Sequence, residues 1–353
     1  MRLQYPTTSQ HHRCNLFTSF LNFSQPNSSS TCHKQTQKKS LTITATVTHR
    51  RKRKIVVIIG PTGAGKSRLS IDLATRFFSS EIINSDKMQV YSGLDITTNK
   101  ITMQERLNVP HHLLGEIDPE KSVFTPSDYR EIVPEIISDV KSRSRLPLVV
   151  GGSSSLIYSL VTKRYDPNLD VFNGANPHPV SSELRYDCCF IWVDVLLPVL
   201  NRYLAKRVDK MLDLGMFEEL VEFFRSGEHK RINRYGLGQA IGIPEFETYF
   251  EKFAGSRQPG GRNSGEDVMG KMEFEAYNEA VRRIKDNTCQ LAKKQVSKIL
   301  RLRDAGWELK SVDATEAFRA VMTPDYGGGR VAEIWEKDVV EPSVKIVRQF
   351  LDD

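Results

Sequence analysis

One short segment, a glycine-rich loop between an apolar run and a helix-forming stretch, constrains this chain more than any other feature. Lys54–Ile59 is apolar after its first residue, and the octet GPTGAGKS follows at Gly60–Ser67. The octet fits G-x-x-x-x-G-K-[ST], and Arg68–Ala74 after it has helical spacing. This order predicts a P-loop, in which backbone N–H groups and a helix N-terminus surround phosphate oxygens. The motif predicts a bound diphosphate or polyphosphate, without saying which compound carries it or whether ATP is hydrolysed.

Further apolar runs alternate with helical patterns, which is typical of a parallel sheet covered by helices. The expected strands are Lys54–Ile59, Glu81–Ser85, Leu148–Val150 and Phe190–Val195. The expected helices are Lys66–Phe78, Pro126–Ser142, Ser154–Thr162, Leu200–Leu214, Phe217–Arg225 and Lys271–Leu302. We therefore predict an α/β fold: a P-loop NTPase-like parallel sheet flanked by helices, with a smaller helical subdomain. Ligands of such sheets bind beyond the carboxyl ends of the strands, so Asp86 and Gly151-Gly152 should lie near the P-loop.

The same patterns divide the chain into four parts. Residues 1–49 are expected to be a disordered leader, and residues 50–200 the P-loop α/β core. Residues 201–270 are expected to form the helical subdomain, which includes a flexible Gly-rich segment at 255–265. Residues 271–353 are expected to be helices that return to the core, and the last of them, 331–351, should be broken at Pro342.

The charge of the chain is concentrated at its N-terminus. The net charge is +7, yet residues 1–54 hold ten Lys and Arg and no acidic residue, which leaves 40 basic and 43 acidic residues in the remainder. Residues 1–49 also contain sixteen Ser and Thr and no sustained apolar run. This composition predicts an organelle transit peptide, most simply for the plastid, with the mitochondrion or cytosol as second choice. A plain basic tail or a nuclear signal at Arg50–Lys54 are the alternatives.

Two other classes of feature receive no support from the sequence. The five cysteines are Cys14, Cys32, Cys188, Cys189 and Cys289. They form no C-x-x-C pair, so neither a zinc ribbon nor a disulfide framework is predicted. Apolar runs stay well short of 18 residues, so we expect no membrane-spanning helix.

Four later segments add chemistry to the P-loop. They are Asn84–Tyr91 (NSDKMQVY), Pro110–Leu113 (PHHL), Leu146–Gly152 (LPLVVGG) and Asn287–Gln295 (NTCQLAKKQ). Together with GPTGAGKS they resemble the isopentenyltransferases, which transfer a dimethylallyl group to the N6 amine of adenine. The resemblance covers most of residues 54–305 and depends on five motifs in order, of which only the P-loop would be specific alone.

The resemblance is closest to the plant enzymes that modify free adenine nucleotides in cytokinin biosynthesis. Leu184–Asp194 and Ala240–Phe246 follow their pattern, whereas the long insertion and the D-P-x-R-I-x-R-A-L-E string of the tRNA-modifying branch are missing. The acidic body agrees, because a tRNA enzyme should carry positive charge on its folded surface. Modification of tRNA remains the first alternative function, followed by a small-molecule P-loop kinase and a non-catalytic nucleotide switch. The chain departs from the plant pattern near Gly238 and Gln239, where a basic residue is usual. The sequence does not distinguish AMP, ADP and ATP as the acceptor.

The resemblance and the P-loop chemistry together assign candidate roles. Asp86 is expected to be the catalytic base that takes a proton from the amine, and Lys66 to stabilise the leaving diphosphate. The expected diphosphate- or substrate-binding residues are Gly60, Pro61, Thr62, Gly63, Ala64, Gly65, Lys66, Ser67, Ser153, Ser155, Lys293 and Lys294. The two lysines could equally form a solvated helix face.

The expected cofactor is Mg²⁺, held through the Ser67 hydroxyl. His111 and His112 are expected to be structural, because no carboxylate cluster accompanies them. The expected partners are an adenine nucleotide and a prenyl diphosphate, either plain or hydroxylated, with no stable nucleic acid and no membrane. We expect the chain to be a monomer.

Overall fold

The computed structural model describes residues 52–76, 79–121, 123–173, 179–253, 266–323 and 328–353. The predicted leader at 1–49 and the Gly-rich segment at 255–265 lie outside these residues. The rest belongs to one compact unit, Arg51–Asp353. Within the described part of the chain, no helix has the length and apolar character needed to cross a membrane.

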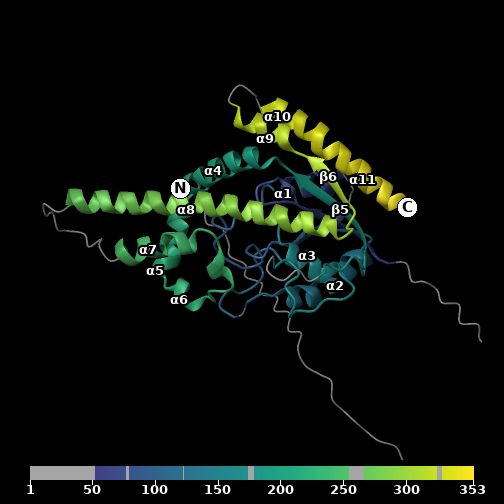
Figure 1. Ribbon diagram of the computed structural model, residues 1–353, viewed down its shortest axis with the longest axis horizontal. Coiled ribbons are helices and arrows are strands. Elements are labelled where there is room, and N and C mark those ends of the chain that lie inside the picture. Colours follow the sequence, from purple (N-terminus) through teal and green to yellow (C-terminus); the bar gives the residue numbers. More distant parts are fainter. Residues whose placement is uncertain (1–51, 77–78, 122, 174–178, 254–265, 324–327) are drawn as a thin grey trace, which may run out of the picture. The chain divides into compact units, whose positions relative to one another are not determined.

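A six-stranded parallel sheet in the order β3-β2-β4-β1-β5-β6 forms the centre of this unit. Figure 1 labels its strands β5 and β6. Its strands are β1 Lys54–Ile59, β2 Ser80–Asn84, β3 His111–His112, β4 Leu146–Gly151, β5 Asp187–Asp194 and β6 Leu309–Asp313. Every adjacent pair is parallel. The chain places β2 to β4 on one side of β1 and β5 and β6 on the other. The predicted parallel sheet is therefore confirmed, and its order reverses next to β1, where such folds bind ligands.

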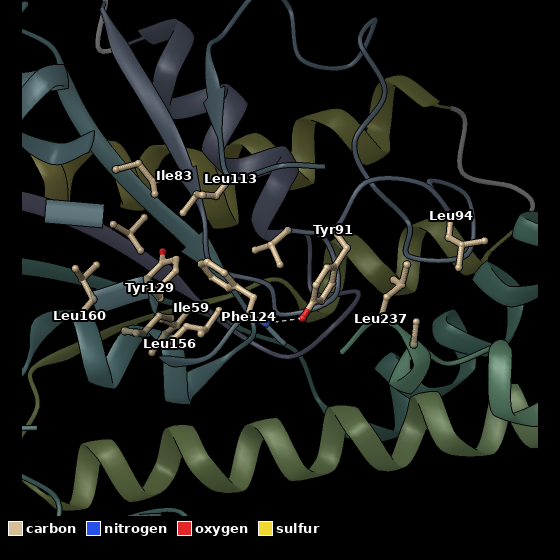
Figure 2. Close-up of a cluster of buried hydrophobic side chains, with 14 of the residues drawn as sticks. Ile59, Ile83, Tyr91, Leu94, Leu113, Phe124, Tyr129, Leu156, Leu160 and Leu237 are labelled. Atoms are coloured by element: carbon tan, nitrogen blue, oxygen red, sulfur yellow. Dashed lines mark hydrogen bonds between the residues drawn. The ribbon is translucent and has the colours of Figure 1, made fainter. Parts of the chain in front are cut away.

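The central strand supplies two cores because successive side chains point to opposite faces. Ile55, Val57 and Ile59 belong to one buried cluster, while Val56 and Ile58 belong to the other. Figure 2 shows part of the first cluster, including Ile59 and Tyr91, whose hydroxyl accepts a 2.8 Å hydrogen bond from the Phe124 N–H. Burial on both faces explains why this strand reads as an unbroken apolar run.

Helices cover both faces of the sheet. They are α1 Lys66–Arg76, α2 Pro126–Ser142, α3 Ser154–Val161, α4 Leu197–Asp213, α5 Met216–Arg225, α6 Glu228–Arg231, α7 Ile243–Phe253, α8 Glu266–Asp304, α9 Thr315–Met322, α10 Gly328–Trp335 and α11 Glu341–Asp352. A 3₁₀ turn, η1, spans Leu237–Gln239, and a π-helical segment, η2, spans Glu336–Val340. Helices α2 and α3 pack into the first cluster, whereas α1, α9 and α11 pack into the second. Helix α4 contributes residues to both clusters, as does α8, the long helix of Figure 1.

The expected helices α1 to α5 and α8 are present, with shifts at their ends. Helix α2 has the predicted bounds at both ends. Its start is fixed by a capping box in which the side chains of Thr125 and Asp128 each bond the other's backbone N–H. Strands β3 and β6 and helices α6, α7 and α9 were not predicted. Strands β4 and β5 begin two and three residues earlier than expected.

The predicted break at Pro342 is wrong. The chain remains helical from α10 through η2 into α11, and Pro342 lies in the first turn of α11. Proline cannot donate the i→i−4 hydrogen bond. The preceding turn widens instead, so that the Glu341 N–H bonds the Glu336 carbonyl five residues back.

Aromatic packing joins the helices of the predicted subdomain. The Phe217 ring of α5 stacks on Phe250 of α7 at 5.9 Å and meets Tyr277 of α8 edge-on at 5.1 Å. Phe246 lies within 6 Å of Phe217, Phe250 and Tyr277. Such ring pairs add to the apolar burial that holds α5 and α7 against α8.

Candidate functional site

The P-loop follows β1 as predicted and opens α1 at Lys66. Gly63 and Gly65 have φ values of +79° and +89°, a region that favours glycine. A Cβ at Gly63 would lie 2.5 Å from Leu204 of α4, and one at Gly65 would lie 2.6 Å from Trp335 at the end of α10. Glycine is therefore required at both positions for two reasons: the backbone has a positive φ, and Leu204 and Trp335 leave no room for a side chain.

Lys66 is buried, with a side chain that points back into the loop. Its Nζ donates a 2.7 Å hydrogen bond to the Pro61 carbonyl. Burial is the main reason why the pKa of Lys66 falls to about 8, while the Asp86 carboxylate acts to raise it and the Arg207 guanidinium lowers it further. The Lys66 ammonium is thus desolvated and hydrogen-bonded to a carbonyl rather than to a carboxylate, so it can bind an anion favourably.

Arg207 of α4 is a site residue that the sequence analysis missed. Its Nη2 donates a 3.2 Å hydrogen bond to the Thr62 hydroxyl, and its buried Nε has no hydrogen-bond partner. Burial lowers the pKa of Arg207, partly opposed by Tyr203 and Asp86. The sequence did contain a signal for Arg207, because it lies three residues after Leu204 and therefore on the buried face of α4. Arginine is rare on a buried helix face unless it has a partner or a ligand.

Asp86 lies just beyond the carboxyl end of β2, as predicted. The Asn84 side chain shapes the turn, since its Oδ1 accepts from the Asp86 N–H at 3.2 Å and its Nδ2 donates to the Leu113 carbonyl at 2.8 Å. One carboxylate oxygen of Asp86, Oδ1, accepts from the Met88 N–H at 3.0 Å. Among the described residues none donates a hydrogen bond to the other oxygen, Oδ2, which is therefore free to bind a ligand.

The carboxyl end of β4 meets the P-loop through Gln295 of α8, another residue without a predicted role. Its Oε1 accepts from the Thr62 N–H at 2.7 Å, and its Nε2 donates to the Gly152 carbonyl at 3.1 Å. Ser153 and Ser155 follow Gly152, and their hydroxyls lie 3.2 Å apart. One amide side chain thus fixes the distance between two of the loops that surround the site.

These loops line one cavity of about 1330 Å³. The predicted residues on its wall are Thr62, Gly63, Gly65, Lys66, Ser67, Asp86, Ser153, Ser155 and Lys294. Gly60, Pro61, Ala64 and Lys293 are not on the wall. The unpredicted residues there include Lys87, Arg207, Gln295 and Lys298, and an apolar part contains Met211, Met216 and Ile241. The cavity therefore combines cationic residues at and near the P-loop with apolar residues elsewhere on its wall.

The histidine pair and the Gly238 region occupy different places. His112 Nε2 lies 2.6 Å from Glu81 Oε2, and Glu81 is also paired with Arg143 and Arg145. His111 bonds the Val109 carbonyl at 2.8 Å and reaches the cavity wall. Gln239 of η1 is on that wall, whereas Gly238 is not.

The predicted Mg²⁺ can be tested against the oxygen donors of the site. In the described part of the chain, no three His, Cys, Asp or Glu residues are grouped as a metal centre. The exposed Ser67 hydroxyl and the Asp86 carboxylate share the cavity wall. Mg²⁺ usually takes one or two protein oxygens, several waters and substrate phosphates. The residues present therefore fit an ion shared with a bound diphosphate, rather than an all-protein metal site.

Comparison with known proteins gives consistent similarities. Residues 89–171 and 168–299 match the family model described as IPP transferase. The chain is 54% identical over 301 residues to an adenylate isopentenyltransferase of Humulus lupulus, covering 84% of this chain and 90% of that protein. It is 50% identical to adenylate isopentenyltransferase 1, chloroplastic, of Arabidopsis thaliana, covering 85% and 82%. A third relative, adenylate isopentenyltransferase 7, mitochondrial, of the same plant is 41% identical over 86% of this chain and 82% of its own length.

Solved structures share the fold. A eukaryotic dimethylallyltransferase acting on tRNA superposes with a TM-score of 0.65 at 24% identity, covering 85% of this chain and 80% of that one. A tRNA isopentenylpyrophosphate transferase of Bacillus halodurans gives 0.59 at 25% identity, covering 84% and 99%.

Proposed function

The chain belongs to the IPP transferase family, and from that premise we propose that it is an adenylate dimethylallyltransferase. It transfers the dimethylallyl group of dimethylallyl diphosphate to N6 of the adenine of AMP, ADP or ATP and releases diphosphate, as a step of cytokinin biosynthesis. The observation that carries this proposal is the cavity that places a P-loop and the Asp86 carboxylate on one wall. A diphosphate and a weakly nucleophilic amine need these two groups side by side.

The reaction can be followed bond by bond at these residues. The adenine N6 lone pair is delocalised into the ring, so the amine becomes a better nucleophile when Asp86 accepts one of its protons. The N6–C1 bond forms while the C1–O bond to diphosphate breaks, and the proton remains on the carboxylate. The Met88 N–H holds Oδ1 of Asp86, which aims the other oxygen at the amine.

The leaving diphosphate gains negative charge as its bond to carbon breaks. Backbone N–H groups of the P-loop, Lys66 and Arg207 lie where they can neutralise that charge. Arg207 lines the cavity, and a planar guanidinium group is well suited to contact phosphate oxygens. Mg²⁺ would be held by the Ser67 hydroxyl together with the substrate, and it would supply further charge neutralisation there.

The main alternative acceptor is adenine in tRNA, since both solved relatives act on tRNA. Two observations favour the free nucleotide. The adenylate enzymes are 54% and 50% identical over most of their length, whereas the tRNA enzymes are 24% and 25% identical. The chain after residue 54 holds 40 basic and 43 acidic residues, which is a poor charge balance for binding tRNA.

We also propose that residues 1–49 direct the protein to the plastid. The acid-free, Ser- and Thr-rich composition supports this, and so do the chloroplastic relatives, although one relative is mitochondrial. Residues 1–49 fused to a fluorescent reporter should carry it into chloroplasts. A mitochondrial, diffuse or nuclear reporter would contradict the plastid assignment.

One assay tests the activity. The purified chain is incubated with plain or hydroxylated dimethylallyl diphosphate and with AMP, ADP, ATP or unmodified tRNA, and the products are resolved by mass. We expect prenylated free nucleotide and no prenylated tRNA. Prenylated tRNA alone would establish the alternative, and phosphate transfer from labelled ATP would identify a kinase.

A further inference from the structure

Among the buried side chains beside the P-loop, the indole of Trp335 has no role in the mechanism. Trp335 is the last residue of α10, next to the π-helical segment η2, and only 3% of its surface is exposed. It lies in the C-terminal part of the chain, after residue 299, where the match to the family model ends. Pi-helical segments are rare and often found at functional sites, which makes this position worth explaining.

The indole of Trp335 contacts the P-loop and α1 at three points. Its Cη2 lies 2.6 Å from where a Cβ would stand on Gly65, so the ring packs directly on that backbone. The Arg68 guanidinium lies 4.6 Å above the ring, and the indole Nε1 donates a 2.8 Å hydrogen bond to Asp72 Oδ2. A single ring therefore touches the loop and the first two turns of the helix that follows it.

We infer that Trp335 is a positioning residue that holds the P-loop in its diphosphate-binding conformation. The inference rests on the proposed function, which assigns the donor diphosphate to this loop. Gly65 has no side chain and can adopt many backbone conformations, so an external wall is needed to keep its φ at +89°. The indole is that wall, and Lys66 is the next residue along the chain. Supporting contacts behind a site are what keep its binding groups in register.

The rest of the C-terminal segment fixes the indole in turn. Glu336, one residue further on, forms a 2.6 Å ion pair with Arg76 at the end of α1. Val339 and Val340 of η2 are fully buried in the same cluster as Leu69 of α1. The segment that carries the ring is thus attached to both ends of α1, which restrains the ring from moving away from the loop.

A matched pair of tryptophan variants tests the inference. Trp307 is 4% exposed and donates its Nε1 hydrogen to the Ser181 carbonyl at 3.0 Å, and its ring pairs with Tyr158 and Phe190 rather than with a P-loop residue. Trp335→Leu and Trp307→Leu should both lower the urea midpoint. Only Trp335→Leu should raise the Kd for inorganic diphosphate and the KM for the prenyl donor, each about tenfold, with the acceptor KM unchanged. Trp335→Phe, which keeps a ring against Gly65, should restore most of the affinity.

The outcomes separate this inference from the proposed function. If Trp335→Leu lowers stability while the diphosphate Kd stays within twofold of wild type, Trp335 is only a core residue and the inference fails. If Trp335→Leu does not fold, Trp335→Met, an unbranched replacement that also takes the ring away from Gly65, should still raise that Kd, and an unchanged value would overturn the inference. A wild-type chain that binds diphosphate and loses affinity in Trp335→Leu, yet transfers no prenyl group, supports the role of Trp335 while refuting the proposed activity.

Discussion

Replacing Lys66 by methionine should abolish activity and yet make the unliganded protein more stable. The pKa of Lys66 lies at about 8 in the folded chain, against 10.5 for an ordinary lysine, because burial penalises the charged form. That gap corresponds to roughly 3 kcal/mol of destabilisation at pH 7. Loss of the 2.7 Å hydrogen bond to the Pro61 carbonyl offsets about 1 kcal/mol. We therefore expect Lys66→Met to raise the free energy of unfolding by about 2 kcal/mol.

The sign of the pH dependence provides an internal check. Between about pH 8 and 10.5 the unfolded chain binds a proton at Lys66 that the folded chain has lost, so wild-type stability rises with pH in this window. The advantage of Lys66→Met should be nearly complete at pH 7 and should vanish near pH 10, where the remaining penalty no longer exceeds the lost hydrogen bond. Urea unfolding at pH 7 and pH 10 measures both values, with Lys294→Met, an exposed lysine of the same cavity, as a control that should change stability by less than about 0.5 kcal/mol. A Lys66→Met variant less stable than wild type at pH 7 would refute the reasoning.

Three other predictions follow from the site. Asp86→Asn should lose nearly all prenyl transfer while its urea midpoint stays at the wild-type value; substantial remaining turnover would make Asp86 an orienting group and not a base. Gln295→Ala leaves the Thr62 N–H and the Gly152 carbonyl without their partner, so unfolding free energy should fall by roughly 2 kcal/mol, and an unchanged midpoint would contradict this bridge. For the free enzyme, kcat/KM for the donor should decline above about pH 8 as Lys66 loses its proton, which a profile flat to pH 10 would exclude.

Most of the elements that were predicted correctly are specified by short stretches of sequence. The P-loop, β1 and α2 are encoded within short windows by a motif, an apolar run and a capping box, and the structure has all of them. Strand β3 has only two residues, His111–His112, and exists because they pair with β2. Strand β6 reads as Leu-Lys-Ser-Val-Asp, too polar to stand out, and is defined by its pairing with β5. Elements that depend on a distant partner left no recognisable pattern.

The same division holds for the candidate site. Lys66 and Asp86 follow strands directly, so a motif and the rule for parallel sheets located them. Arg207 and Gln295 approach Thr62 from positions 145 and 233 residues away, on helices whose packing the sequence alone does not define. The C-terminal wall formed by Trp335 was missed for the same reason, since 270 positions of sequence separate it from Gly65.

The central claim is that the P-loop holds the diphosphate of the prenyl donor and not the phosphates of the nucleotide. Steady-state kinetics of Lys66→Ala, with each substrate varied in turn, test it most directly. We expect the KM for dimethylallyl diphosphate to rise at least tenfold and kcat to fall, because Lys66 also stabilises the charge that develops on the leaving group, while the KM for the adenine nucleotide changes little. An unchanged donor KM together with a greatly raised nucleotide KM would contradict the claim and reverse the assignment of the two substrates within the cavity.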